Sequence, residues 1–277
     1  MAKKILLASG CSYTDKNYIS FDKEVPEDQR GGWKFWPEIM ANKLDLKCVN
    51  VARSGRGADF IFDETIKHIL MYGDLIDTVV IMWSGSDRSS FYTYELNPIL
   101  EIYNDSLPSN DKTTFDPFIW MDQIGIGKIN KKFWDSPHFN KKVYYKMMEN
   151  QLIKMVSLIE ICKAKNIKLI MGQGLVFFNF SPIEKMYTSG TISENAYISK
   201  QNVLDYFFKS PFFPYLEKNK KHIIGWPFWS QFGGRTFEDF RFGKEQYFIS
   251  SKDRHPNEKG QQLFAEYFIE RHGELYG

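Results

Sequence analysis

The stretch Thr78-Val79-Val80-Ile81-Met82-Trp83 is the clearest strand signal in this chain of 277 residues. It carries no charge and begins with β-branched residues, which is typical of a parallel strand buried on both faces. Similar apolar runs occur on both sides of it along the chain. The further strands that they predict span residues 5–9, 47–51, 167–172 and 222–225.

Helical patterns separate these strands, because apolar residues recur there every three to four positions. The predicted helices span residues 33–44, 58–71, 145–165 and 257–272. Strands that alternate with helices indicate an α/β fold, with a parallel sheet of about five strands covered on both faces. Ligands of such sheets bind outside the carboxyl ends of the strands, so functional residues are expected there.

Two long stretches, 89–142 and 175–247, interrupt this alternation and are rich in aromatic residues, Pro and Gly. Loops of this length usually form lids, binding elements or small subdomains. Aromatic residues make up 17% of the chain, which leaves two interpretations: rings that line a binding cleft, or a Phe-rich core. Because no repeat or low-complexity linker divides the chain, we predict a single domain, 1–277, with two insertions.

Composition argues against several classes of protein. The net charge of +2 and the lack of a dense Lys/Arg block argue against nucleic-acid or membrane binding. The first ten residues are too short for a signal-peptide core, and no segment approaches the length of a membrane span, so a soluble cytoplasmic protein is expected. Cys11, Cys48 and Cys162 lack metal-ligand spacing, so no metal or cofactor is expected, and the oligomeric state is not predicted.

A hydroxyl, an imidazole and a carboxylate occur near the two ends of the chain. Ser12 follows the first predicted strand within three residues, while Asp253 and His255 precede the last predicted helix. Pro256 restrains His255 to an extended conformation, in which residues two apart face the same way. These three groups are the components of an acyl-transfer triad.

The turn after the first strand allows two interpretations. If a helix begins there, its free N–H groups favour a negative charge that develops beside Ser12. Alternatively, Gly10-Cys11-Ser12 is an ordinary turn in which Ser12 caps a helix. The loop 50–57 after the second strand contains Gly55, where the backbone can approach a ligand, although a plain glycine turn explains it equally well.

Small polar residues also end the strand that opened this section. Ser86 and Asp87 follow it closely, and Trp83, Asp87 and Arg88 are candidate substrate-binding residues at the same sheet edge. The alternative is a turn in which Asp87 caps a helix and Arg88 forms a surface ion pair.

Together the four segments resemble the four sequence blocks of the SGNH (GDSL-like) hydrolases, a family of esterases, lipases and carbohydrate deacetylases. The resemblance covers the predicted strands and both ends of the chain, but neither insertion. It implies a three-layer α/β/α sandwich of the flavodoxin-like type.

The resemblance also implies roles for individual residues. Ser12 falls on the family nucleophile and on one oxyanion donor, Gly55 on a second donor, and Asp253-Arg254-His255 on the last block. Cys11 replaces the usual Asp of the first block. Ser86 stands where the family has an Asn that donates to the oxyanion. A serine hydroxyl is shorter than an amide but can still donate, so Ser86 is a candidate third oxyanion donor. Loss of one such donor typically costs about a hundredfold or more in rate.

Three functional hypotheses follow. The first is a serine esterase that cleaves a carboxylic ester, for which a carbohydrate O-acetyl group is one candidate because aromatic rings stack on sugars. The second is a degenerate protein that binds a glycan or protein partner without hydrolysis, as the loss of the Asn suggests. The third is an O-acyltransferase that uses the same triad. Each hypothesis implies a small-molecule or glycan ligand, and the second hypothesis also allows a protein partner.

Overall fold

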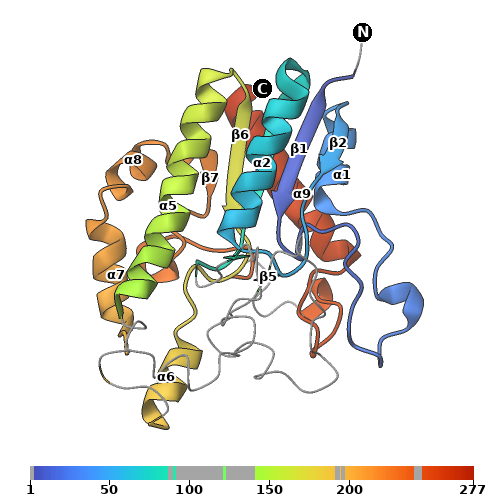
Figure 1. Ribbon diagram of the computed structural model, residues 1–277. Coiled ribbons are helices and arrows are strands. Elements are labelled where there is room, and N and C mark those ends of the chain that lie inside the picture. The colour runs from blue at the N-terminus through green and yellow to red at the C-terminus, as the bar shows by residue number, and fades with distance from the viewer. Residues whose placement is uncertain are drawn as a thin grey trace.

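The fold is built on a parallel sheet of five strands in the order β2-β1-β3-β6-β7 (Figure 1). The computed structural model describes residues 3–86, 90–91, 121–122, 141–190, 194, 197–239 and 245–277. The five strands are β1 (Ile5–Gly10), β2 (Lys47–Asn50), β3 (Ile76–Trp83), β6 (Lys168–Gln173) and β7 (Ile223–Ile224). All four strand pairings are parallel, which confirms the predicted sheet.

The strand order reverses at β1, which lies between β2 and β3. Ala8 pairs with Asn50 on one side and with Val80 on the other, so the carboxyl ends of the three strands are level. Such a switch in strand order opens a crevice at the carboxyl edge of a sheet. In Figure 1 this edge points down, away from both chain termini.

Helices cover both faces of the sheet. Along β1, Ile5 and Leu7 belong to one buried cluster, whereas Leu6 and Ala8 belong to the other, because successive side chains of a strand point to opposite faces. The first cluster includes side chains of α2 (Ala58–Tyr72), α5 (Lys141–Ala164), α7 (Lys200–Lys209) and α8 (Phe213–Lys218). The second includes side chains of α1 (Trp36–Lys43) and α9 (Glu258–Tyr276). The result is the predicted three-layer α/β/α sandwich.

Three helix starts differ from the sequence prediction: α5 begins at residue 141 rather than 145, and the other two differences are explained by capping. The Phe35 N–H donates to the Glu38 carboxylate at 3.0 Å, so α1 begins at Trp36 rather than at residue 33. The Asn257 side chain accepts from the Gly260 N–H at 3.0 Å and caps α9. Pro256 therefore lies before the cap and outside the helix.

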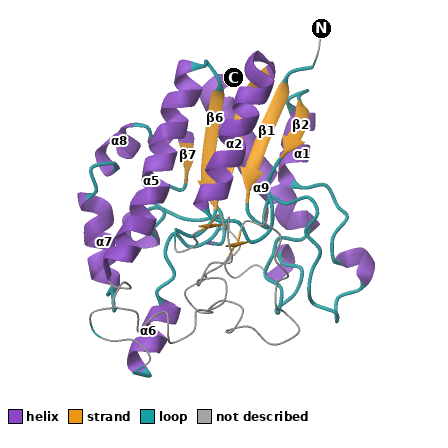
Figure 2. Cartoon of the chain, viewed as in Figure 1, coloured by secondary structure: helices purple, strands orange, loops and turns teal. Residues whose placement is uncertain are grey.

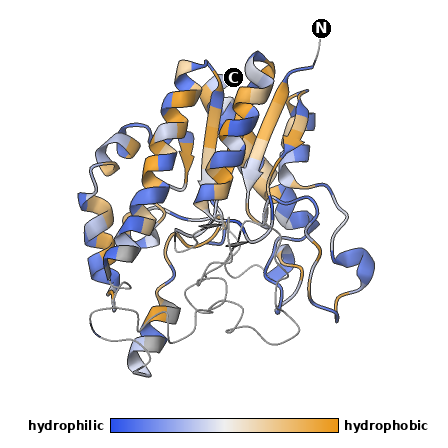
Figure 3. Ribbon diagram, viewed as in Figure 1, coloured by the Kyte–Doolittle hydropathy of each residue, from blue (hydrophilic) through white to orange (hydrophobic). Residues whose placement is uncertain are grey.

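The described part of the second predicted insertion, 175–247, packs on the sheet rather than forming a lid. Its helices α7 and α8 belong to the first buried cluster, and the short helix α6 (Ser181–Thr188) precedes them. Many of its aromatic side chains are partly buried against this cluster, and the buried ones include Phe177, Phe207, Trp226, Phe228 and Trp229. Figure 3 shows hydrophobic strands between helices that carry both kinds of residue. For this segment the core interpretation of the aromatic content is therefore correct.

The first predicted insertion, 89–142, lies almost entirely outside the described residues. Within it, β4 (Ser90–Phe91) and β5 (Met121–Asp122) form a short antiparallel pair, and α5 begins at the end of this insertion (Figure 2).

No helix among the described ranges is long and apolar enough to cross a bilayer. The prediction of a single domain stays a prediction. Short 3-10 helices span Glu27–Gln29, Gly73–Leu75, Lys220–His222, Ser230–Phe232 and Glu245–Tyr247.

Candidate active site

Ser12 lies in a tight turn directly after β1, and no α-helix begins there. The N–H groups of Thr14 and Asp15 both donate to the Cys11 carbonyl, at 2.9 and 3.1 Å. Gly10 leaves room for this turn, because a Cβ at that position would lie 2.5 Å from the Thr14 hydroxyl oxygen. The next helical element along the chain is the 3-10 helix at residue 27, so neither a helix N-terminus behind Ser12 nor a capping role for it is correct.

The loop after β2 is joined to this turn by hydrogen bonds. The Asn50 side chain donates to the Thr14 carbonyl at 2.7 Å, and its amide oxygen accepts from the Ala52 N–H at 3.0 Å. The Arg53 N–H donates to the Gly10 carbonyl at 3.2 Å. The carboxyl ends of β1 and β2 therefore carry one connected pair of loops.

Asp15 also joins the two loops through hydrogen bonds. Its carboxylate, which is buried, accepts from the Ser54 N–H at 2.7 Å and from the Ser54 hydroxyl at 2.8 Å. The next residue, Gly55, has φ +81°, a left-handed conformation that favours glycine. Within the described part of the chain, neither the Gly55 N–H nor the Ser12 N–H has a hydrogen-bond acceptor.

The structure brings Ser12, His255 and Asp253 into one hydrogen-bonded series. His255 Nε2 lies 2.7 Å from Ser12 Oγ, and His255 Nδ1 lies 2.5 Å from Asp253 Oδ1. Ser12 and His255 are 243 positions apart along the chain, and the sheet brings them together. Asp253 Oδ1 also accepts from the His255 backbone N–H at 3.1 Å, so the two residues contact each other through side chain and main chain. This geometry lets the imidazole accept the hydroxyl proton.

The segment that carries the imidazole is held by a neighbouring loop. The Ile249 N–H donates to the His255 carbonyl, and the Ser250 N–H donates to the Asp253 carbonyl, both at 3.0 Å. Phe248 forms a β-bridge with Pro256. These contacts fix the backbone on both sides of the imidazole.

Asp253 is fully buried and remains ionised at neutral pH. Burial alone would raise the pKa of this carboxyl group, but hydrogen bonds from His255, Ser20 and Tyr18 outweigh burial and hold the pKa well below its usual range. An anionic Asp253 requires the proton of the neutral imidazole on Nδ1, which leaves Nε2 free to accept from Ser12.

Tyr18 contacts both the acid and the imidazole, and sequence reasoning missed it. Its phenol O–H donates to Asp253 Oδ2 at 2.8 Å, and its ring stacks on the His255 ring with centroids 4.0 Å apart. Tyr13 approaches the same imidazole edge-on, at 5.3 Å. The chain has 15 Tyr, and no local pattern singles out these two. Closeness to Ser12 in sequence was the one available signal.

Ser86 does not point its hydroxyl proton at the Ser12 region. Its Oγ and its N–H both donate to the Phe177 carbonyl, at 2.6 and 2.8 Å. A hydroxyl has one proton to donate, so in this arrangement Ser86 does not replace the amide donor of the family, and that prediction is corrected.

The predicted substrate-binding residues have different outcomes. Trp83 is fully buried in the cluster beside α2 and α5, with its indole Nε1 3.4 Å from Met171 Sδ. It is therefore a core residue rather than a substrate contact. Asp87 and Arg88 lie outside the described residues.

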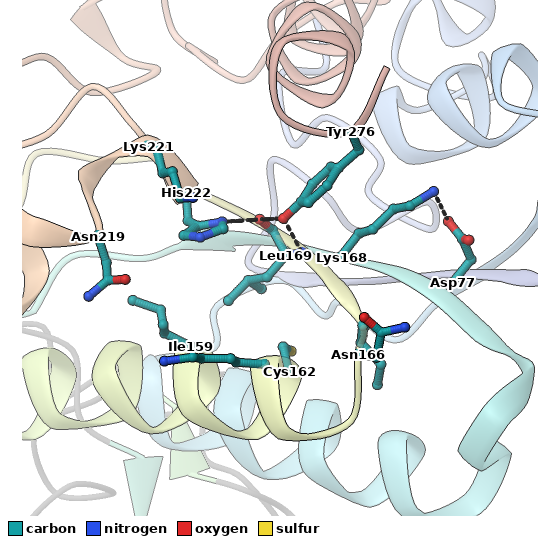
Figure 4. Close-up of a pocket in the computed structure, with 12 residues that line it drawn as sticks. Asp77, Ile159, Cys162, Asn166, Lys168, Leu169, Asn219, Lys221, His222 and Tyr276 are labelled. Atoms are coloured by element: carbon teal, nitrogen blue, oxygen red, sulfur yellow. Dashed lines mark hydrogen bonds and ion pairs between the residues drawn. The ribbon is translucent and has the colours of Figure 1, made fainter.

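A cavity of about 580 Å³ lies at the opposite edge of the sheet (Figure 4). Lys168 begins β6 and Tyr276 ends α9, and both line this cavity. His222 Nδ1 lies 3.2 Å from the Tyr276 hydroxyl and 3.2 Å from the Leu169 carbonyl oxygen, and burial lowers the pKa of His222. The cavity is thus separate from Ser12. No cluster of metal-ligating side chains is found among the residues with described positions.

Comparisons with known proteins give structural similarity only. No protein-family model and no curated protein matches the sequence. The fold is similar to a G-D-S-L family protein from Desulfitobacterium hafniense, with TM-score 0.45, 11% identity, and 97% and 99% of the two chains covered. It is similar to the psychrotrophic esterase EstA from Pseudoalteromonas sp., with TM-score 0.47, 13% identity and 98% of each chain covered. It is also similar to a catalytic mutant of an acetylxylan esterase from Geobacillus stearothermophilus, with TM-score 0.43, 14% identity, and 98% and 94% covered.

Proposed function

We propose that this protein is a serine esterase of the SGNH type, in which Ser12 is the nucleophile, His255 the base and Asp253 the residue that orients the base. The observation that carries the proposal is the unbroken series of hydrogen bonds from Ser12 Oγ through the imidazole to the buried carboxylate. Its position at the carboxyl edge of a parallel sheet, beside the switch in strand order, is where such folds bind ligands.

The proposed reaction has two halves. In the first, Ser12 Oγ attacks the ester carbonyl carbon while His255 Nε2 takes the hydroxyl proton. The tetrahedral intermediate collapses, the bond to the leaving alcohol breaks, and the imidazolium returns its proton to that oxygen. In the second half, His255 removes a proton from the water that attacks the acyl carbonyl carbon. The bond between that carbon and Ser12 Oγ then breaks, the imidazolium returns its proton to Ser12 Oγ, and the acid leaves. Asp253 stays ionised throughout and stabilises the imidazolium.

The proposed oxyanion donors are the backbone N–H groups of Ser12 and Gly55. Their support is that neither group has an acceptor among the described residues, and that the bonds between Asp15 and Ser54 hold the second loop beside the first. Two donors rather than three would lower the rate by about a hundredfold relative to a complete site. We therefore expect slow turnover rather than none.

The substrate is proposed only as a carboxylic ester. A carbohydrate O-acetyl ester stays a prediction from composition, and it loses support because many of the described aromatic residues of 175–247 are buried in the first cluster or pack against it. Because the Ser86 hydroxyl donates to the Phe177 carbonyl, it favours one competing function, which is binding of a ligand without hydrolysis.

The test compares ester hydrolysis and fluorophosphonate labelling in wild type, Ser12→Ala and Ser157→Ala. Ser157 is a matched control because it lies on α5 and its hydroxyl donates to the Ile153 carbonyl, away from the site. We expect wild type and the control to hydrolyse short-chain p-nitrophenyl esters and to be labelled. Ser12→Ala should lose labelling and about 10⁴-fold or more of kcat.

Two other outcomes decide between the hypotheses. Wild type that is neither labelled nor active, under conditions where a known esterase is both, would leave the non-hydrolytic binder. An acyl group transferred to an added acceptor sugar faster than to water would identify an acyltransferase that uses the same triad.

A further inference from the structure

The Asp253 carboxylate is held at both of its oxygens. Oδ1 accepts from His255 Nδ1 and from the His255 backbone N–H, the latter at 3.1 Å. Oδ2 accepts from the Tyr18 phenol at 2.8 Å. Because the two oxygens point in different directions, the phenol restrains rotation of the carboxylate, together with the hydrogen bond from Ser20, and keeps Oδ1 directed at the imidazole.

The backbone of Asp253 is fixed separately. Its N–H donates to Ser250 Oγ at 2.9 Å, and that hydroxyl donates to the Asp22 carboxylate at 2.6 Å. The loss of the Tyr18 phenol would therefore leave the main chain in place. It would release mainly the side-chain torsion that aims the carboxylate.

The Tyr18 ring restrains the imidazole directly. The two rings lie 4.0 Å apart with an interplanar angle of 27°, so the tyrosine covers one face of the imidazole. Tyr13 meets the imidazole at 85° and 5.3 Å from another direction. An aromatic face also stabilises the imidazolium that forms when Ser12 loses its proton.

The Tyr18 phenol stays protonated and so can donate a hydrogen bond. Burial, followed by the hydrogen bond to Asp253, raises the pKa of Tyr18 above its usual range, so the hydroxyl keeps its proton throughout the working pH range. Tyr18 lies 235 positions from Asp253, and the contact joins the loop after β1 to the segment before α9.

We propose that Tyr18 is a positioning residue for the Ser12–His255–Asp253 series, with two separable parts: the phenol O–H aims the carboxylate, and the ring holds and shields the imidazole. This inference rests on the proposed esterase function for its kinetic consequence. Its geometric part, the alignment of the Asp253–His255 hydrogen bond, holds independently of catalysis.

The two parts are separated by two substitutions. Tyr18→Phe removes the hydroxyl and keeps the ring, whereas Tyr18→Leu removes both. We expect kcat to fall about tenfold in the first variant and about a hundredfold in the second, with KM changed by less than about twofold. Tyr215→Phe is the matched control, since it removes a tyrosine–carboxylate hydrogen bond to Glu160 between α8 and α5, and it should leave kcat unchanged.

A spectroscopic measurement separates positioning from a loss of folded protein. The His255 Nδ1 proton, which lies in a short hydrogen bond to Asp253, should give a resolved low-field proton resonance. We expect Tyr18→Phe to shift this resonance and Tyr18→Leu to broaden or abolish it, while Tyr215→Phe leaves it in place. The same spectra are recorded in a Ser12→Ala background, where turnover plays no part.

The outcomes distinguish this proposal from the proposed function. Unchanged kcat in both Tyr18 variants of an active enzyme would overturn the positioning role, as would an unshifted resonance in either background. If wild type lacks esterase activity, the esterase proposal fails. The resonance in the Ser12→Ala background still decides whether Tyr18 aligns the Asp253–His255 pair.

Discussion

Asp15 accepts both hydrogen bonds that Ser54 can donate, from its N–H at 2.7 Å and from its hydroxyl at 2.8 Å. Asp15 belongs to the turn that carries Ser12, and Ser54 precedes Gly55. This buried carboxylate thus joins the loop of the proposed nucleophile to the loop of the second proposed oxyanion donor, in addition to the bonds from Asn50 to Thr14 and from Arg53 to Gly10.

Replacement of Asp15 should therefore lower catalysis more than stability. Asp15→Ala removes both contacts to Ser54 and a third from the Asn17 N–H. A shift of about 1 Å in the position of a donor costs up to about a hundredfold in rate. We therefore expect kcat on a short-chain ester to fall by about ten- to a hundredfold. Asp205→Ala, which removes an exposed carboxylate bonded to Gln201, is the control. Equal kcat in the two variants would show that the Asp15 connection does not position a donor.

Substitution of Ser86 should instead lower stability more than catalysis. Because its hydroxyl donates to the Phe177 carbonyl, we expect Ser86→Ala to lose about 1 kcal/mol of stability and to keep kcat within about threefold. Chemical denaturation and ester kinetics measure the two quantities. A hundredfold fall in kcat at unchanged stability would instead restore Ser86 as an oxyanion donor.

Gly10 tests the turn that carries Ser12. In Gly10→Ala the new Cβ would lie 2.5 Å from Thr14 Oγ1 and 3.0 Å from the Met82 carbonyl, so the turn must shift. We expect about 1–3 kcal/mol of destabilisation, together with a fall in kcat that persists in the folded fraction. The control is Gly273→Ala in α9, where a Cβ meets nothing within 4 Å and helix propensity favours alanine by about 1 kcal/mol.

Asp253 makes stability depend on pH with a defined sign. Its folded-state pKa lies below the ordinary value of 3.8, so the unfolded chain takes up the proton first as pH falls. The contribution of the carboxylate is present above about pH 4–5 and is lost as pH falls through the lowered folded-state pKa. The free energy of unfolding should thus differ most between wild type and Asp253→Asn near pH 7, and this difference should shrink below about pH 4. A difference that stays constant from pH 7 to pH 3 would contradict the assignment.

The strands and helices were predictable because their signals are local. The apolar runs and the Asp253–His255 spacing lie within a few residues, and the structure places them as the sequence indicates. Trp83 was assigned wrongly although the information was present. Trp83 lies on the same face of β3 as Val79 and Ile81, because the three residues alternate along the strand, and all three side chains lie in the first buried cluster.

The contacts of Tyr18, Asp15 and Ser86 were not predictable in this way. The contact between Tyr18 and Asp253 spans 235 positions, and that between Ser86 and Phe177 spans 91. Which hydroxyl meets which acceptor over such separations depends on where the crossovers place each loop. No pattern of neighbouring residues encodes that placement.

The separation of Ser12 and His255 by 243 positions also has a consequence for protein synthesis. A ribosome makes the proposed nucleophile 243 positions before its base, at roughly 5–20 residues per second. Throughout that interval the nascent chain carries a serine without a partner imidazole. Prematurely terminated chains that end before residue 253 would therefore lack both the proposed base and its orienting carboxylate, whatever part of the sheet they had formed.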